Sequence, residues 1–253
     1  MITAIVQARM GAKRLPGKVL KEVMGKPLLG YQMERLRTCQ RLDGIILATT
    51  NKPEDDRIAI FGEKEKLSVY RGSEDDVLDR YYQSARVFHV KHIMRITADC
   101  PLIDPALCDQ LIEVYIKSGV DFVHTGPTYA EGVDCEIFSF SALEKAWCEA
   151  KLKSEREHVT LYMHNHSELF KKITLDNETD DSKYRFTVDE KEDIIVVREI
   201  IEKLYMEGKQ PLSTNDIKMF LDTHQDTYKL NAEVIRNEGL QRSLEEDQLH
   251  EST

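Results

Sequence analysis

The sequence is short of the residues and patterns that mark several protein classes. It has 12 glycines and 7 prolines among 253 residues, too few for a collagen-like chain, and its 41% hydrophobic content excludes wholesale disorder. No apolar run approaches the roughly 20 residues that span a bilayer, so we expect no membrane insertion. Five cysteines are present without a C-x-x-C pair, and their odd number favours reduced thiols over a disulfide scaffold.

The N-terminus also lacks the features of a secretion signal. Its first ten residues, MITAIVQARM, contain no basic leader, no long apolar stretch and no small-residue cleavage site. Together with the reduced thiols, this pattern predicts a cytoplasmic protein.

Charge is plentiful but unevenly distributed. The chain has 35 Lys and Arg against 45 Asp and Glu, a net charge of −10, and such an acidic surface repels a nucleic-acid backbone. Residues 1–26 differ, because they hold six Lys or Arg and one Glu, a net charge of +5, so the remaining 227 residues carry −15. A compact basic segment on an acidic chain suits a small polyanion such as a triphosphate. We therefore predict no nucleic-acid partner.

The first half of the chain alternates strand-like and helix-like segments. The patterns predict strands at 3–7, 44–49, 68–71 and 92–97, and helices at 27–39, 53–66, 77–88 and 105–117. Ser73 and Asp76 resemble a capping box before the third helix, and Pro27 suits a first helical position. This alternation predicts an α/β fold with a mostly parallel sheet and right-handed crossovers.

Beyond about residue 124 the alternation loosens. We expect strands at 133–140, 171–175 and 184–188, and helices at 142–151, 155–164, 191–205 and 214–221. The polar end, residues 241–253, is expected to be a frayed tail. The economical interpretation is a single domain over 1–240, in which residues 125–185 form an α+β elaboration.

Two carboxylates follow predicted strands. Asp99 comes directly after strand 92–97, and Asp189 comes directly after strand 184–188. Ligands of open α/β sheets collect at the carboxyl ends of the strands, and one or two carboxylates suit Mg²⁺ that is otherwise held by water and phosphates. The alternative for Asp189 is that it caps the helix that follows.

A basic loop follows the first strand. Residues 7–18, QARMGAKRLPGK, carry four cations, and Gly11 and Gly17 allow a close approach of the backbone to a ligand. The loop is neither a Walker loop nor a dinucleotide fingerprint. The plain alternative is a solvated basic loop.

Five segments, in this order and spacing, resemble the motifs of sugar cytidylyltransferases. That family contains the CMP-3-deoxy-manno-octulosonate and CMP-acylneuraminate synthetases, and the resemblance is strongest to the branch typified by spore coat polysaccharide biosynthesis protein F. The segments are IVQARMGAKRLPGK (5–18), RGSEDDVLDR (71–80), RITADCPLID (95–104), REHVT (156–160) and TVD (187–189). The resemblance covers roughly residues 1–205. Ala12 departs from it, because Ser or Thr is frequent there.

The resemblance implies a GT-A-like, Rossmann-like, three-layer α/β/α nucleotidyltransferase fold with a mostly parallel mixed sheet. It implies Mg²⁺ as cofactor and a possible homodimer. Carried over by position, it implies these roles: catalysis by Arg9, Lys18 and Asp99; nucleotide binding by Ala8, Arg9, Gly11, Arg14, Lys18, Arg71 and Gly72; metal binding by Asp99 and Asp189; and contact with the acceptor sugar or another subunit by Arg156, Glu157 and His158.

The implied reaction transfers CMP from CTP to an acidic or amino sugar similar to a ulosonic acid, releasing pyrophosphate, for surface or spore coat polysaccharide. Two alternatives remain open: a metal-dependent GT-A glycosyltransferase, and a non-catalytic nucleotide-binding partner of a polysaccharide assembly complex. Four loop cations fit a triphosphate better than a two-phosphate donor. Residues 126–136 are the expected place of acceptor specificity.

Overall fold

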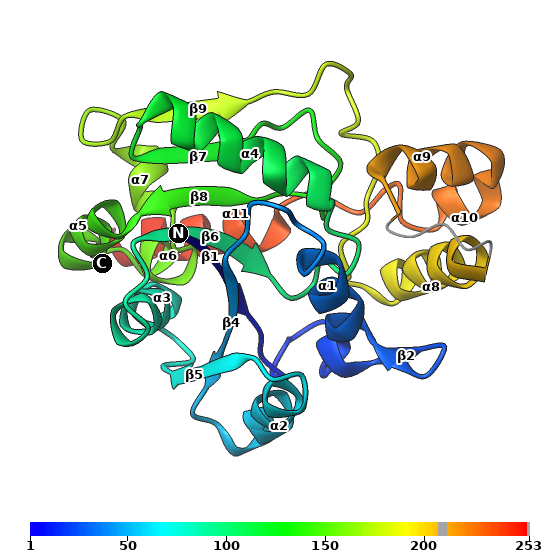
Figure 1. Cartoon of the computed structure of the whole chain (residues 1–253), viewed down its shortest axis with the longest axis horizontal. Coiled ribbons are helices and arrows are strands. Elements are labelled where there is room, and N and C mark those ends of the chain that lie inside the picture. Colours follow the sequence, from blue (N-terminus) through cyan, green and yellow to red (C-terminus); the bar gives the residue numbers. More distant parts are fainter. Residues whose placement is uncertain (207–211, 252–253) are drawn as a thin grey trace.

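A seven-stranded sheet organises the computed structural model, which describes residues 1–206 and 212–251 (Figure 1). The strand order is β5-β4-β1-β6-β8-β7-β9. Neighbours among β5, β4, β1 and β6 are parallel, β8 is antiparallel to both β6 and β7, and β7 and β9 are parallel. The strands are β1 (Ile2–Gln7), β4 (Gly44–Thr50), β5 (Ser68–Gly72), β6 (His92–Thr97), β7 (Phe122–Thr125), β8 (Glu136–Ser139) and β9 (Lys172–Leu175).

Helices cover both faces of this sheet. Successive side chains of a strand point to opposite faces, so in β1 Val6 joins the core under one set of helices and Ile5 the core under the other. The first core includes residues of α1 (Leu28–Leu36), α4 (Pro105–Ser118), α8 (Lys191–Met206) and α9 (Thr214–Thr223), and the second includes residues of α3 (Val77–Val87), α5 (Phe140–Glu149) and α7 (Leu161–Asn165). Because both faces are buried, the central strands are continuous apolar runs.

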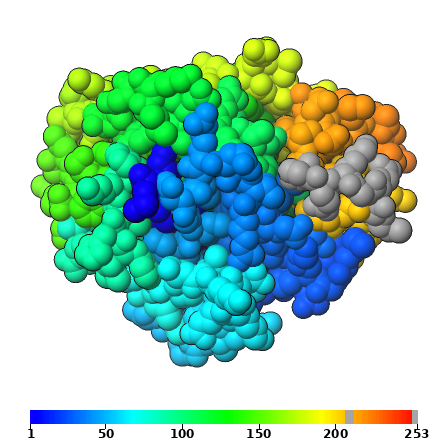
Figure 2. Space-filling model, viewed as in Figure 1, coloured from blue at the N-terminus to red at the C-terminus, as the bar shows by residue number. Residues whose placement is uncertain are grey.

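The remaining elements are short or peripheral. They are the hairpin β2 (Glu22–Val23) and β3 (Lys26–Pro27), the 3₁₀ helices η1 (Lys18–Leu20) and η2 (Pro53–Asp55), and the helices α2 (Asp56–Lys64), α6 (Lys153–Glu157), α10 (Gln225–Lys229) and α11 (Glu238–Glu251). In the view of Figure 1, α11 passes behind the sheet, and its red colour does not appear on the surface that faces the viewer in Figure 2. No described helix is both long and apolar enough to cross a membrane.

The α/β fold and the first-half elements agree with the sequence predictions, with two local corrections. Asp76, not Ser73, is the N-cap of α3: its side chain accepts a hydrogen bond from the Asp79 backbone, while Ser73 Oγ accepts one from the Asp76 backbone. Pro27 belongs to β3 and precedes α1.

The second half differs more from its prediction. Segment 155–164 forms two helices, α6 and α7, separated by residues 158–160, of which Val159 has a φ of 33°. The predicted strand 133–140 is confined to β8, and β7 was not predicted. Segment 184–188 is no strand: it makes a single bridge, between Arg185 and Glu131.

The prediction of a frayed C-terminal tail was wrong for the described residues up to Glu251. They form most of α11, in which Ser243 and Asp247 are buried. Hydrogen bonds and ion pairs, more than apolar packing, attach α11 to the rest of the chain. Its sequence therefore has no apolar stripe from which a helix could have been predicted. Residues 252–253 of the predicted tail lie outside the described residues.

Candidate functional site

A cavity of about 1010 Å³ lies where the chain leaves β1 and β6. Both halves of the chain line it, because the basic loop and Asp99 meet Asp189, segment 126–136 and the start of α11 there. Of the residues proposed from the sequence, the cavity is lined by Ala8, Arg9, Arg14, Lys18, Asp99, Glu157, His158 and Asp189.

Lys18 joins the two carboxylates that the sequence singled out. Its Nζ lies 2.6 Å from Asp189 Oδ1 and 3.2 Å from Asp99 Oδ2. Two backbone features bring them together: Gly17 has a left-handed conformation, with φ of 70°, that starts the turn carrying Lys18, and the Val188 backbone donates a hydrogen bond to Asp99 O at 2.8 Å. The basic loop and both carboxylates therefore meet in one cavity.

The ionisation of this pair follows from its environment. Burial raises the pKa of Asp99, but Lys18 and a hydrogen bond from Thr97 outweigh it and hold the pKa at about 2, below the ordinary 3.8. Burial lowers the pKa of Lys18, but Asp99 and Asp189 outweigh it and raise the pKa above 10.5. At neutral pH Lys18 is therefore an ammonium and Asp99 a carboxylate.

These two carboxylates fit a divalent cation. Their oxygens already share one positive charge, that of Lys18. Mg²⁺ is commonly held by only one or two carboxylates together with substrate phosphates, so a third protein ligand is not required. Among the described residues no group of three or more His, Cys, Asp or Glu is arranged around a metal position.

Asp189 does not cap the helix that follows it. The backbone N–H groups of Asp189 and Glu190 donate to Asp193 Oδ2, each at 2.8 Å, so Asp193 satisfies the start of α8. The carboxylate of Asp189 is directed at cations instead. Besides Lys18, it lies 3.2 Å from Arg14 and 3.2 Å from Arg185.

The basic loop is held by a buried carboxylate that the sequence analysis missed. Asp55, 1% exposed, accepts a hydrogen bond from the Met10 backbone at 2.6 Å and another from Thr50 Oγ1. Met10 and Asp55 are 45 residues apart, so no local sequence pattern predicts this hydrogen bond. Asp55 therefore sets the path of the loop as it leaves β1.

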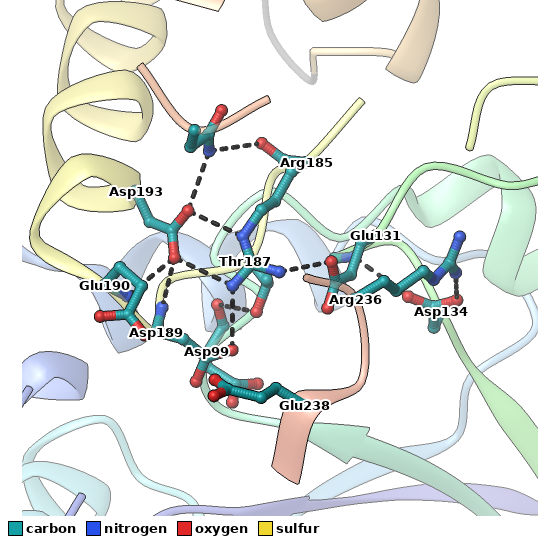
Figure 3. Close-up of polar contacts among 12 residues, drawn as sticks. Asp99, Glu131, Asp134, Arg185, Thr187, Asp189, Glu190, Asp193, Arg236 and Glu238 are labelled. Atoms are coloured by element: carbon teal, nitrogen blue, oxygen red, sulfur yellow. Dashed lines mark hydrogen bonds and ion pairs between the residues drawn. The ribbon is translucent and has the colours of Figure 1, made fainter. Parts of the chain in front are cut away.

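A second missed group is centred on Arg185, which is 5% exposed (Figure 3). Its guanidinium pairs with Glu131 and lies 2.8 Å from Asp193 and 3.2 Å from Asp189. Nearby, Arg236 pairs with Asp134 at 2.7 Å. The sequence indicated this region only through the expectation that residues 126–136 determine acceptor specificity. Residues of that segment line the cavity.

Four proposed residues lie outside the cavity lining. Arg71 donates to the carbonyls of Thr50 and Lys52 and pairs with Asp56 at 2.6 Å. A Cβ on Gly72 would come within 2.9 Å of the Tyr70 ring, so this glycine serves packing. Neither residue is brought to the cavity.

Gly11 and Arg156 are the other two. The position of a Cβ on Gly11 faces the Glu74 side chain at 3.1 Å. Arg156 binds both oxygens of Asp76 and donates to Trp147 O at 2.7 Å, and thereby joins α6 to α3 and α5. Its observed contacts are structural.

The chain is similar to known proteins over most of its length. A family model described as cytidylyltransferase matches residues 3–219. The chain is 38% identical over 240 residues to the uncharacterized protein MJ1063 of Methanocaldococcus jannaschii, covering 92% of this chain and 95% of the relative. It is 31% identical over 240 residues to spore coat polysaccharide biosynthesis protein SpsF of Bacillus subtilis, covering 89% and 95%. A solved cytidylyltransferase from Leptospira borgpetersenii is similar with a TM-score of 0.85 and 32% identity, covering 90% of this chain and 96% of that one.

Proposed function

The chain belongs to the cytidylyltransferase family and is a nucleotidyltransferase, and from that premise we propose that it transfers CMP from CTP to an acidic or amino sugar similar to a ulosonic acid. Pyrophosphate is the second product. The observation that carries the proposal is the meeting of Lys18, Asp99 and Asp189 beside a loop rich in cations.

The loop cations would bind and orient the triphosphate. In the reaction, a sugar hydroxyl attacks the α-phosphorus, its proton is released, and the bond from the α-phosphorus to the oxygen that bridges to the β-phosphate breaks. Negative charge grows on the departing pyrophosphate. Arg9, Arg14 and Lys18 supply positive charge in a partly enclosed cavity, where electrostatic stabilisation is stronger than in bulk water.

Asp99 and Asp189 are the proposed ligands of Mg²⁺. When bound, Mg²⁺ would neutralise phosphate oxygens and help to align them. The contribution of the chain itself is to keep Asp99 ionised, through Lys18, and to keep the Asp189 carboxylate available, through the capping of α8 by Asp193.

The biological setting is proposed from the relatives. The printed name of the Bacillus subtilis relative refers to spore coat polysaccharide, and we extend polysaccharide biosynthesis to this chain. CTP is made in the cytoplasm, which is where we place the reaction. A homodimer and a single domain over residues 1–240 stay predictions that size-exclusion chromatography and limited proteolysis would check.

A pyrophosphate-release assay tests the function. The four nucleoside triphosphates are crossed with 3-deoxy-manno-octulosonate, N-acetylneuraminate and simple hexoses, with and without Mg²⁺. We expect release only with CTP, Mg²⁺ and a 2-keto sugar acid or its amino derivative. CTP binding measured by calorimetry without release in any combination would contradict the enzymatic proposal and favour a nucleotide-binding partner.

A further inference from the structure

Three of the buried polar atoms that lack a hydrogen-bond partner belong to residues of the cavity lining. Among the described residues, nine buried side-chain nitrogen or oxygen atoms have no partner. Those in the cavity lining are Gln7 Oε1, Arg80 Nε and Arg95 Nε. Buried polar atoms are nearly always hydrogen-bonded in folded proteins, so unpartnered atoms beside a cavity point to a ligand or to ordered water.

The three residues meet on one side of the sheet. Ile5 of β1 belongs to the core that α3 covers, and side chains two residues apart in a strand share a face, so Gln7 faces α3. Arg95 of β6 is paired in register with Ile5 and faces the same way. Arg80 lies in the first turn of α3. The next residue, Tyr81, holds α3 against β1, because its hydroxyl lies 3.0 Å from Ile5 O.

Arg80 differs from the other buried arginine of the cavity lining in having no carboxylate partner. Arg185 forms ion pairs with Glu131 and Asp193. Arg80, 1% exposed, forms no ion pair within the part of the chain that the structure describes, and its hydrogen bond there runs from Nη1 to Ser73 O at 2.8 Å. A guanidinium has five N–H donors and keeps its charge in proteins. Burying that charge without a counter-ion costs free energy.

The charged neighbours of Arg80 do not supply the missing counter-ion. Burial lowers the pKa of Arg80, and the positive charge of Arg9 lowers it further. Asp55 and Glu74 oppose this, but neither forms an ion pair with Arg80 among the described residues, and Glu74 is 3.9 Å from Arg9. Two guanidinium groups thus leave positive charge at this wall of the cavity.

An anion would neutralise that charge and accept the unused hydrogen bonds. Arg9 belongs to the basic loop, for which a triphosphate is the proposed ligand, so an anion that binds Arg9 comes close to Arg80 as well. Phosphate oxygens accept strong, charge-assisted hydrogen bonds from guanidinium groups.

We propose that Arg80 is a further nucleotide-binding residue, whose guanidinium donates from the cavity wall to a phosphate oxygen of the triphosphate that Arg9 also binds. The resemblance implied Arg71 and Gly72 of the same motif, which the structure places outside the cavity lining. This inference rests on the proposed function, because it names a further residue of that site.

The same charge predicts a cost to the protein without its ligand. A buried cation without a counter-ion destabilises the fold, and replacing it relieves this cost. An arginine with a purely structural role would behave in the opposite way, since its loss would lower stability. Stability without ligand therefore separates the two roles.

The test compares Arg80→Gln and Arg80→Lys with the unmodified chain. Arg80→Gln removes the charge and keeps an amide donor, whereas Arg80→Lys keeps the charge and loses the planar guanidinium. Arg86→Gln is the matched control, because Arg86 is an exposed arginine of the same helix. Calorimetry measures the Kd of CTP and of inorganic triphosphate, and thermal unfolding measures stability without ligand. Pyrophosphate release at saturating CTP gives the sugar KM.

We expect the Kd of CTP and that of inorganic triphosphate to rise about tenfold to hundredfold in Arg80→Gln, because a charge-assisted hydrogen bond is lost. In Arg80→Lys both should rise about threefold to tenfold, since an ammonium replaces only the charge. Arg86→Gln should leave both within about twofold, as is usual for an exposed substitution. The sugar KM should stay within about threefold. The thermal midpoint of Arg80→Gln without ligand should equal or exceed that of the unmodified chain.

A Kd of CTP in Arg80→Gln within about twofold of the unmodified value, whether or not the thermal midpoint falls, overturns the inference and leaves the proposed function standing. A rise in the sugar KM without a rise in the Kd of CTP also overturns it, since the guanidinium would then bind the acceptor. Should Arg80→Gln fail to fold, Arg80→Lys decides by the same criterion. If the unmodified chain binds neither CTP nor inorganic triphosphate, the proposed function itself is contradicted, and the inference falls with it.

Discussion

The two halves of the cavity are built in different ways. On the proposed nucleotide side, residues up to Ser118, the charged groups come from two short motifs, and each follows a parallel strand of the sheet directly. On the proposed acceptor side, residues from Phe122 onward, the groups come from segment 126–136, Arg185, Asp189, α6 and α11. The charged groups of the first side lie within short, continuous sequence motifs. Those of the second side come from segments that are far apart in the sequence.

The two sides also differ in how their cations are paired. Of the four cations in the basic loop, Lys18 and Arg14 are paired with carboxylates, whereas Lys13 makes no ion pair within the described chain and Arg9 is 3.9 Å from its partner Glu74. In contrast, Arg185 forms ion pairs with Glu131 and Asp193, and Arg236 forms one with Asp134. Arg9 and Lys13 are therefore the loop cations with positive charge left for an anionic ligand, whereas Arg185 and Arg236 join segments of the cavity wall.

The largest effect on activity is expected from removing the Asp99 carboxylate, which lies where the two sides of the cavity meet. We expect Asp99→Ala to lower turnover by about 10²–10³-fold, the range typical of losing one charge-stabilising group in an active site. Pyrophosphate release measures this, and circular dichroism with thermal unfolding should show a retained fold. Near-normal CMP-sugar formation by this variant would refute the assignment of Asp99.

Replacing a paired arginine of the acceptor side should act on stability first. Arg185→Met leaves Asp193, which is fully buried, and Glu131 without their cation, and we expect the free energy of unfolding to fall by about 3–5 kcal/mol. Urea unfolding gives the value. The control is Arg41→Met, which breaks an exposed pair with Glu113 and should change it by no more than about 1 kcal/mol. Equal effects of the two substitutions would show that the buried network is not a structural unit.

The smallest expected effect is a pH dependence specific to the nucleotide side. Because the folded-state pKa of Asp99, about 2, lies below the ordinary 3.8, its pairing with Lys18 contributes stability above about pH 4 and loses it as the pH falls toward 2. The unfolding free energies of the unmodified chain and Asp99→Asn should therefore converge over that window. A difference between them that is constant from pH 5 to pH 2 would contradict the depressed pKa.

The sequence predicted those parts of the site that a local pattern encodes. The basic loop, its strand and Asp99 were recognised because strand, turn and charge follow one another within a few residues. Arg71, Gly72, Gly11 and Arg156 belong to the same motifs, yet they serve packing and local pairing outside the cavity lining, since a motif does not say which of its side chains point into a cleft.

The groups that were missed have partners far away in the sequence. Asp55 holds Met10 across 45 residues, and Ser243 holds Glu157 across 86. Helix α11 was mistaken for a tail because it is attached by polar contacts, which leave no hydrophobic period to read.

By itself the sequence determined an α/β chain with a basic loop after its first strand and an acidic residue after two later segments, because periodicity and turn chemistry are local properties. Only the tertiary structure decided that Lys18 reaches both carboxylates, 81 and 171 residues away, and that a polar C-terminal helix walls the same cavity. The physical reason is that strand order and helix docking bring distant segments together, and no local pattern carries that information.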